Sequence, residues 1–338
     1  MNLNDLPFAP HPLIRGPIAQ TIAASRFSGK SLLPERTLHK LKIDPQNQLM
    51  IFEMKPEQNT GPLVLMAHGM GGCSESAYMK RIAGKLFARG YGVFLMNQRG
   101  SGPGMGLCDR LWNGGSSGDL DRVVNYITGL YPQRPLLLIG FSLSGNILLK
   151  YLGESRKIPS SVYAALAINP PIDLKISSKM ISEGPWAGTF NGYFLDMMNR
   201  QVEAMVECLG GAYRPARAAK TIYEFDVLYT APAFGFKDVD DYYSQSSSKQ
   251  FLDAIRVPTT ILCSKDDPFV PEGVFRGSRM SLCVDYLNPD FGGHMGYISK
   301  SKNPLGDRRW MDYICVRWAQ EVCKGSAVEV DPLKQEGY

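Results

Sequence analysis

Short runs of apolar residues recur along the chain, and the stretches between most of them repeat apolar positions at helical spacing. Most runs lack polar alternation, which is typical of strands buried on both faces of a parallel sheet. The intervening segments carry apolar residues at about every third or fourth position, which predicts amphipathic helices. The pattern predicts strands at residues 38–43, 49–54, 63–67, 93–96, 136–139, 164–168, 259–263 and 282–287.

Strands that alternate with helices predict an α/β fold with a mostly parallel central sheet and helices on both faces. The alternation stops at residues 170–250, which are rich in Gly, Met and aromatic residues. This stretch is too long for a loop, so we expect a mostly helical cap insertion. The predicted division is an N-terminal arm at 1–34, a core at 35–169 and 251–325, the cap, and a polar tail at 326–338.

Composition removes several classes of function. The 37 basic and 32 acidic residues give a net charge of +5, but the basic residues form no stripe with interleaved aromatics, so nucleic-acid binding is not expected. Seven cysteines without a CxxC pair and four dispersed histidines predict neither a metal site nor a disulfide framework, and no cofactor motif is present. Without a signal peptide or an apolar stretch of about 20 residues, the sequence predicts a cytoplasmic protein with no transmembrane segment, while peripheral membrane contact stays open.

The peptide from Gly140 to Ser144 joins a predicted buried strand to a predicted helix. Ser142 in this strand–turn–helix setting is typical of a nucleophile elbow, in which a strained turn lifts the hydroxyl clear of the sheet. Gly140 lets strand and helix approach closely, whereas Ser144 replaces the second glycine of the G-x-S-x-G pattern and predicts some crowding. The alternative is that Ser142 is only a helix N-cap, a common role for serine.

A serine nucleophile needs a base and an orienting carboxylate, which here follow in the chain order Ser, acid, His. The predicted strand 259–263 leads into Asp266 and Asp267, and the next strand leads into a Gly-Gly-His294 loop. His294 is the last histidine of the chain and the only one after Ser142. We expect Asp267 to be the acid because a short turn follows it, with Asp266 as the alternative; a surface-loop role is the alternative for His294.

The oxyanion of an acyl-transfer reaction needs two fixed N–H donors. The backbone N–H of Leu143, directly after Ser142, is one candidate. The glycine-rich peptide from His68 to Gly72 follows the first parallel strand and supplies the Met70 N–H as the second. Glycine-rich turns also bind phosphates, but this one lacks the P-loop lysine. His68 itself is expected to fix the loop by hydrogen bonding rather than to act in catalysis.

These residues resemble the YheT-like branch of the α/β-hydrolase fold family. The matching peptides are HGMGG, GFSLSGN, SKDDPFVP and GGHMGYI, the NQRGSG loop at 97–102, and cap peptides that begin at Glu224 and Gly235. Together they cover about residues 62–298. The resemblance implies a carboxylic-ester hydrolase with Ser142, Asp267 and His294 as its triad. Two departures are Ser144 in the elbow and Ile18 where the family's N-terminal His-Leu-Gln-Thr has histidine.

The sequence therefore predicts a serine esterase that acts on small or lipid-like acyl esters. Acyl transfer to an alcohol and thioester hydrolysis use the same triad and stay open as alternatives. A non-catalytic binding protein on this fold is the alternative from another class. The Met and aromatic residues of the cap either line an acyl pocket or pack the cap onto the core, and the sequence favours neither.

Overall fold

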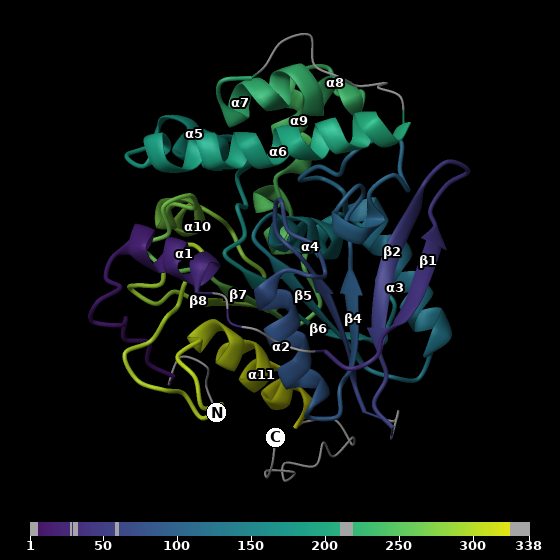
Figure 1. The fold of residues 1–338 in the computed structure, drawn as a ribbon. Coiled ribbons are helices and arrows are strands. Elements are labelled where there is room, and N and C mark those ends of the chain that lie inside the picture. The colour runs from purple at the N-terminus through teal and green to yellow at the C-terminus, as the bar shows by residue number, and fades with distance from the viewer. Residues whose placement is uncertain (1–5, 28, 30–32, 58–60, 210–218, 325–338) are drawn as a thin grey trace.

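The computed structural model describes residues 6–27, 29, 33–57, 61–209 and 219–324 (Figure 1). Its strands form one sheet in the order β1-β2-β4-β3-β5-β6-β7-β8. The β1–β2 and β2–β4 pairs are antiparallel, and the remaining pairs are parallel. The strands are β1 Thr37–Lys42, β2 Gln48–Met54, β3 Leu63–Ala67, β4 Gly92–Met96, β5 Leu136–Phe141, β6 Val162–Ile168, β7 Thr259–Leu262 and β8 Val284–Leu287.

Each predicted apolar run overlaps a strand, but the last run is two residues too long at its start. Leu282 lies outside β8 and is fully exposed. The chain turns here because the Val284 N–H donates to the Ser281 carbonyl (3.1 Å) and the Cys283 N–H donates to the Ser281 hydroxyl (3.0 Å). Apolar character alone did not reveal this turn.

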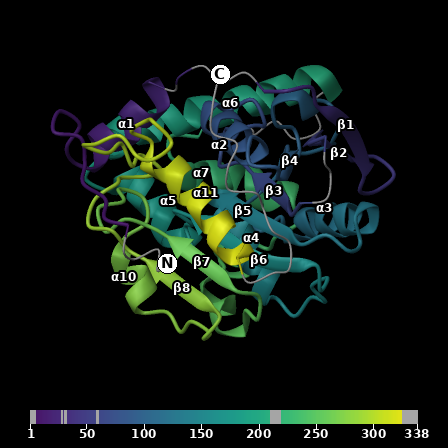
Figure 2. The same cartoon turned by 90° about the horizontal axis from the view of Figure 1, so that it is seen from below.

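Helices cover both faces of the sheet, as predicted (Figures 1 and 2). Alternate residues of β3 show why: Val64 and Met66 join the apolar cluster of one face, whereas Leu63 and Leu65 join that of the other. Both faces of a parallel strand are thereby removed from water. Helices α2 (Ala77–Phe87) and α11 (Trp310–Cys323) cover the first face, and α3 (Ser117–Leu130) and α4 (Leu143–Gly153) cover the second.

A helical layer lies between β6 and β7 in the chain and above the carboxyl ends of the parallel strands (Figure 1). The mostly helical insertion is thus confirmed, while its limits as a domain stay a prediction; the predicted tail at 326–338 lies outside the described residues. Within the described residues, no helix combines the length and apolar character that crossing a membrane requires. The layer contains α5 Leu174–Glu183, α6 Ala187–Leu209, α7 Ile222–Phe225, a π-helix at Asp226–Thr230, α8 Ala231–Ala233 and α9 Val239–Ser246.

The N-terminal arm holds a helix that the sequence did not predict, α1 at Pro17–Arg26. Its Gln20 is fully buried and exchanges hydrogen bonds with the backbone of Ile298 (2.7 and 3.1 Å). Pro10 forms an isolated antiparallel bridge with Ser299 nearby. This part of the arm therefore packs against the loop that follows β8, which brings it to the candidate site.

Candidate active site

Ser142 occupies the sharp turn between β5 and α4. Its backbone has φ 51° and ψ −120°, a conformation that costs energy for any residue with a side chain and that clusters at functional sites. The Ser142 N–H donates to the Ile168 carbonyl (2.8 Å), and the Gly145 N–H donates to the Ser142 carbonyl (2.7 Å). A Cβ at Gly140 would lie 2.5 Å from the Ser144 carbonyl oxygen, so the turn requires glycine there. The Ser142 side chain makes no capping hydrogen bond, contrary to the N-cap alternative.

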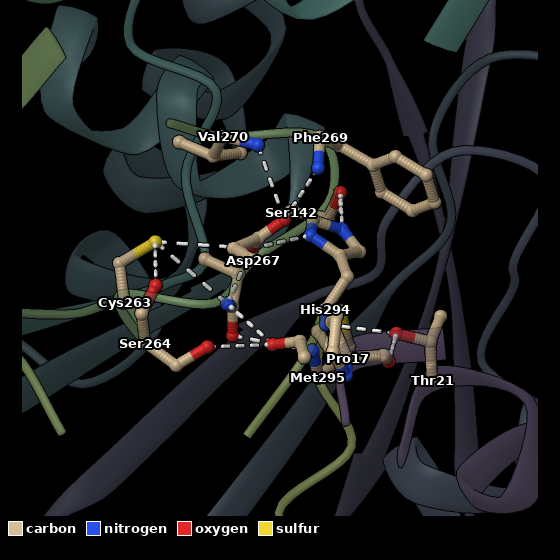
Figure 3. A network of polar contacts seen from close by, with 12 residues as sticks. Pro17, Thr21, Ser142, Cys263, Ser264, Asp267, Phe269, Val270, His294 and Met295 are labelled. Atoms are coloured by element: carbon tan, nitrogen blue, oxygen red, sulfur yellow. Dashed lines mark hydrogen bonds and ion pairs between the residues drawn. The ribbon is translucent and has the colours of Figure 1, made fainter. Parts of the chain in front are cut away.

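Three of the predicted residues meet at the carboxyl edge of the sheet (Figure 3). The Ser142 Oγ lies 2.8 Å from the His294 Nε2, and the His294 Nδ1 lies 2.8 Å from the Asp267 Oδ2. The His294 side chain is 11% exposed, so it is not a surface-loop histidine. Each of the three comes from a loop after a different strand, β5, β7 or β8, as Ser–acid–His order predicts.

Asp267 is fully buried and surrounded by hydrogen-bond donors. Its Oδ1 accepts the N–H groups of Phe269 (2.8 Å) and Val270 (3.1 Å), and its Oδ2 accepts the Asn169 amide (2.6 Å) in addition to His294. Asn169 also spans the histidine loop, because its Oδ1 accepts the Met295 N–H (3.3 Å). Sequence reasoning missed Asn169, although a polar residue directly after the buried strand β6 was a usable signal.

Asp266 faces a different group from its neighbour. Its Oδ1 accepts the Gly293 N–H (2.8 Å), and burial raises the pKa of its carboxyl above the ordinary value. It thus holds the loop that carries His294 without contacting the imidazole. Between the two aspartates that the sequence left open, Asp267 is the one that contacts His294.

Helix α1 also contacts the loop that carries His294, in addition to Asp266 and Asn169 (Figure 3). The Thr21 hydroxyl accepts the His294 N–H (2.9 Å) and donates to the Pro17 carbonyl (2.7 Å). A Cβ at Gly293 would lie 2.4 Å from that carbonyl, so helix and loop are in close backbone contact. In the sequence Thr21 is only the last residue of the segment that matches the family's His-Leu-Gln-Thr, and the pattern predicts no role for it.

The glycine-rich loop after β3 lies directly against the nucleophile turn. A Cβ at Gly69 would be 3.1 Å from the Ser142 Cβ. The His68 Nε2 accepts the Gln98 N–H (3.1 Å), which leaves the Nδ1–H to donate to the Gly69 carbonyl (2.8 Å). Burial lowers the pKa of His68 to about 4, so its imidazole is neutral and fixes the loop.

A cavity of about 490 Å³ opens at Ser142, and both core and cap residues line it. Both residues predicted to supply oxyanion donors, Met70 and Leu143, line it beside Ser142 and His294. The Met and aromatic residues of the cap could either pack the cap onto the core or line an acyl pocket. Phe190 is buried and packs on Phe269, with ring centroids 4.7 Å apart. Four others line the cavity, namely Tyr193, Phe194, Met197 and Met198. The described residues hold no group of three or more His, Cys, Asp or Glu side chains that could bind a metal.

Comparison with known proteins identifies the family of this chain. Residues 62–301 match the model of the alpha/beta hydrolase fold family. The chain belongs to this family. The solved esterase Pf2001 of Pyrococcus furiosus has the same fold, with a TM-score of 0.56 and 15% identity over 87% of this chain and 96% of the esterase.

Relatives in sequence include esterases. The medium-chain fatty acid ethyl ester synthase/esterase 2 of Saccharomyces cerevisiae is 30% identical over 268 residues, 72% of this chain and 59% of the yeast protein. YheT of Escherichia coli is 27% identical over 263 residues, 76% of each chain. The resemblance to the YheT-like branch is therefore confirmed, although the chain spans only about three fifths of the yeast relative.

In this alpha/beta hydrolase the serine at position 144 has a defined role in the turn. Ser144 is fully buried; its hydroxyl donates to the His68 carbonyl and accepts the Gln98 side-chain amide (3.0 Å). The hydroxyl of Ser144, which stands where the family has glycine, connects the nucleophile turn to the glycine-rich loop, and the crowding that this departure predicts stays a prediction. This connection could not be foreseen, because Gln98 comes from a third loop, after β4.

Proposed function

We propose that this alpha/beta hydrolase cleaves carboxylic acyl esters through an acyl-enzyme on Ser142. The observation that carries the proposal is the continuous chain of contacts from Ser142 through His294 to Asp267, with 2.8 Å at each step, at the floor of a largely apolar cavity. A serine that shares a hydrogen bond with a carboxylate-oriented imidazole has the base that its nucleophilic attack requires.

The reaction proceeds in two steps. The Ser142 oxygen attacks the ester carbonyl while His294 takes the hydroxyl proton, and the tetrahedral intermediate expels the alcohol, which leaves with that proton. His294 then removes a proton from water, the hydroxide adds to the acyl-enzyme, and the carboxylic acid departs as Ser142 regains its hydrogen. Asp267 holds the imidazole in the tautomer with Nδ1–H and stabilises its charged form in both steps.

The N–H groups of Met70 and Leu143 are proposed to donate hydrogen bonds to the oxyanion. Both residues line the cavity next to Ser142, and the close approach of Gly69 to Ser142 brings the glycine-rich loop to the reacting carbon. Leu143 is the first residue of α4, so its N–H belongs to the group of helix-start donors that have no partner within the helix. Donors fixed in this way stabilise charge without reorganisation.

The cavity supports a fatty acyl group as the acid part of the substrate. Phe194, Met197 and Met198 of α6 face it with Ile181 of α5, an apolar and adaptable lining. The yeast relative's name specifies medium-chain fatty acid esters, and the same class is proposed for this chain.

Covalent labelling by a fluorophosphonate, read by intact mass, tests the proposal. The wild type is expected to gain one adduct, whereas Ser142→Ala and His294→Ala are expected to gain none at the same exposure. Asp240→Asn, an exposed cap aspartate paired with Lys175 (2.7 Å), is a control that should label like the wild type. A folded wild-type protein that stays unlabelled contradicts the proposal.

Acyl transfer to an alcohol is the second candidate function. The observation that favours it is the word synthase in the name of the yeast relative, since forming an ethyl ester requires an alcohol to take the place of water. Adding ethanol during hydrolysis of an aryl ester separates the two activities. Faster release of the aryl alcohol with accumulation of ethyl ester supports transfer, and an unchanged rate with only free acid supports hydrolysis.

A further inference from the structure

The cap contributes a polar group to the cavity, although most of the lining is apolar. Four side chains there make one connected group, which we call the Asp226 cluster: Asp226, Thr230, Tyr243 and Ser178. The Asp226 Oδ1 accepts the Thr230 hydroxyl (2.7 Å), and its Oδ2 accepts the Tyr243 hydroxyl (2.8 Å). The Tyr243 oxygen lies 2.9 Å from the Ser178 hydroxyl, which donates to it.

Local backbone geometry brings Asp226 into this position. Asp226 and Thr230 are the first and last residues of the π-helix, a wider helical turn that is frequent at functional sites. Tyr243 and Ser178 come from α9 and α5, so three segments of the cap join in this cluster, in which Thr230 and Tyr243 contact the carboxylate and Ser178 contacts Tyr243. Tyr242, next to Tyr243, accepts the Gly114 N–H (3.0 Å), and its apolar cluster also packs Leu143, the residue after the proposed nucleophile.

The charge of Asp226 has no cationic partner among the described residues. No lysine, arginine or histidine of the described chain forms an ion pair with it. A carboxylate can accept about four hydrogen bonds, and two hydroxyls leave about half of this capacity unused. The residues that the structure describes show no further hydrogen bond to Asp226, and the cavity that it lines can supply a donor from a ligand.

Stability alone does not explain an aspartate at this position. Burial raises the pKa of Asp226 to about 6 from 3.8, which means that the folded protein disfavours its charged form. An uncompensated buried charge costs stability, and a neutral side chain of the same shape would avoid that cost. Polar groups in an otherwise apolar cavity commonly fix the orientation of a ligand and determine specificity.

We propose that Asp226 binds a hydrogen-bond donor of the ester substrate, a hydroxyl or an ammonium group that lies away from the bond to be cleaved. This inference rests on the proposed function of Ser142, because both residues line the same cavity. A donor in the ligand fills the unused acceptor positions of the carboxylate, and an ammonium group also balances its charge. An ester without such a group leaves the buried carboxylate uncompensated and binds more weakly.

Matched esters of octanoic acid test the inference. One series varies the alcohol, with the ethyl ester compared with the hydroxyethyl and dimethylaminoethyl esters. The other keeps an ethyl ester and places a hydroxyl or an ammonium group at the far end of the acyl chain. The measured quantity is kcat/KM for each ester relative to the ester of its series without a donor. A structural defect lowers all rates alike, whereas loss of recognition changes this ratio.

We expect the wild type to favour a donor-bearing ester by about 10- to 100-fold in at least one series. Asp226→Asn should move that ratio toward one, more for ammonium than for hydroxyl esters because the amide keeps one acceptor oxygen but no charge. Asp240→Asn, an exposed aspartate on the same cap, should keep the wild-type ratio.

Two results overturn the inference. One is a wild type that labels with fluorophosphonate and cleaves all esters of both series with equal kcat/KM, a measurement that needs no variant. The other is a folded Asp226→Asn protein that keeps the full preference. A wild type that neither labels nor cleaves any ester instead contradicts the proposed function of Ser142, so the two failures are distinguishable.

Discussion

Asp267 and Asp226 are both buried aspartates: Asp267, in the core, contacts His294, and Asp226, in the cap, lines the cavity itself. Asp267 accepts two backbone N–H groups, the Asn169 amide and the His294 imidazole. Asp226 accepts two side-chain hydroxyls, from Thr230 and Tyr243. The first carboxylate is therefore held by groups that belong to the sheet edge, and the second by groups that rotate about single bonds.

This difference suits Asp267 to positioning the imidazole and Asp226 to recognising a ligand. Backbone donors cannot turn away without moving a strand or loop, so they keep Asp267 and the imidazole in one geometry through every turnover. Hydroxyl donors reorient easily and leave acceptor positions open, which suits a group that meets a ligand. The comparison predicts that changes on the core side reduce catalysis and that changes on the cap side alter selectivity and pH-dependent stability.

The largest expected effect comes from Asp267→Asn. The amide disfavours the tautomer that lets His294 accept the Ser142 proton and cannot stabilise the imidazolium, so kcat should fall by about 10⁴-fold. Asp266→Asn is the matched control, because its side chain contacts the Gly293 N–H and an amide oxygen still accepts that bond. Steady-state kinetics on a chromogenic ester measures both. Equal losses in the two variants would contradict the assignment of Asp267.

The next largest effect concerns stability and Asp226. Its pKa is raised from 3.8 to about 6, so between these values the folded protein keeps a proton that the unfolded chain loses, and stability decreases as pH rises. An asparagine at this position does not titrate, so the Asp226→Asn variant should not lose stability in this way. Between pH about 4 and about 7 its free energy of unfolding should rise relative to that of the wild type by up to about 3 kcal/mol. Tyr242 and Tyr243, which face Asp226, do not titrate here because burial raises both pKa values above 10.

Urea unfolding at several pH values measures this difference. Asp240→Asn serves as the control, because it removes a carboxylate from the exposed surface of the same cap and should follow the wild-type curve. A difference between Asp226→Asn and wild type that stays constant with pH would show that the buried charge is compensated in the folded protein.

The sequence predicted the parts of this molecule that local pattern determines. Apolar runs between Gly, Pro and polar residues predicted the strands, and the chain order of Ser142, Asp267 and His294 predicted which side chains meet. It failed for α1 because the buried residues of this helix are Gln20 and Ala23, so no apolar stripe marks it. A helix that packs through hydrogen bonds of a buried glutamine has no apolar periodicity, so this pattern cannot predict it.

Contacts across the fold could not be predicted from one sequence either. Thr21 and His294 are 273 residues apart, and Asn169 and Asp267 are 98 apart. Asp226 lies on a cap helix where a charged residue is ordinarily expected to face water. Its burial follows only once α9 places Tyr243 against it and α5 places Ser178 against Tyr243.

A smaller effect is expected from Thr21→Val, which tests a side-chain support on the core side. The valine has nearly the same shape but cannot accept the His294 N–H, so the loop loses one fixed contact and kcat/KM should fall by about tenfold. Thr21→Ser keeps the hydroxyl and should restore most of the activity. The fall should appear in kcat with little change in KM. A serine variant as impaired as the valine variant would show that packing, not the hydrogen bond, matters here.

The smallest effect on catalysis is expected from Ser144→Ala. Removing the hydroxyl leaves the Gln98 amide without its acceptor and should cost about 1–2 kcal/mol of unfolding free energy, measured in urea. The backbone bonds of Ser142 to Ile168 and Gly145 remain, so kcat/KM should change less than in Thr21→Val. A larger fall would mean that the nucleophile turn depends on the hydroxyl network of Ser144. The core side would then depend on rotatable side chains, as the Asp226 cluster does. The contrast between the core side and the cap side of the cavity would not hold.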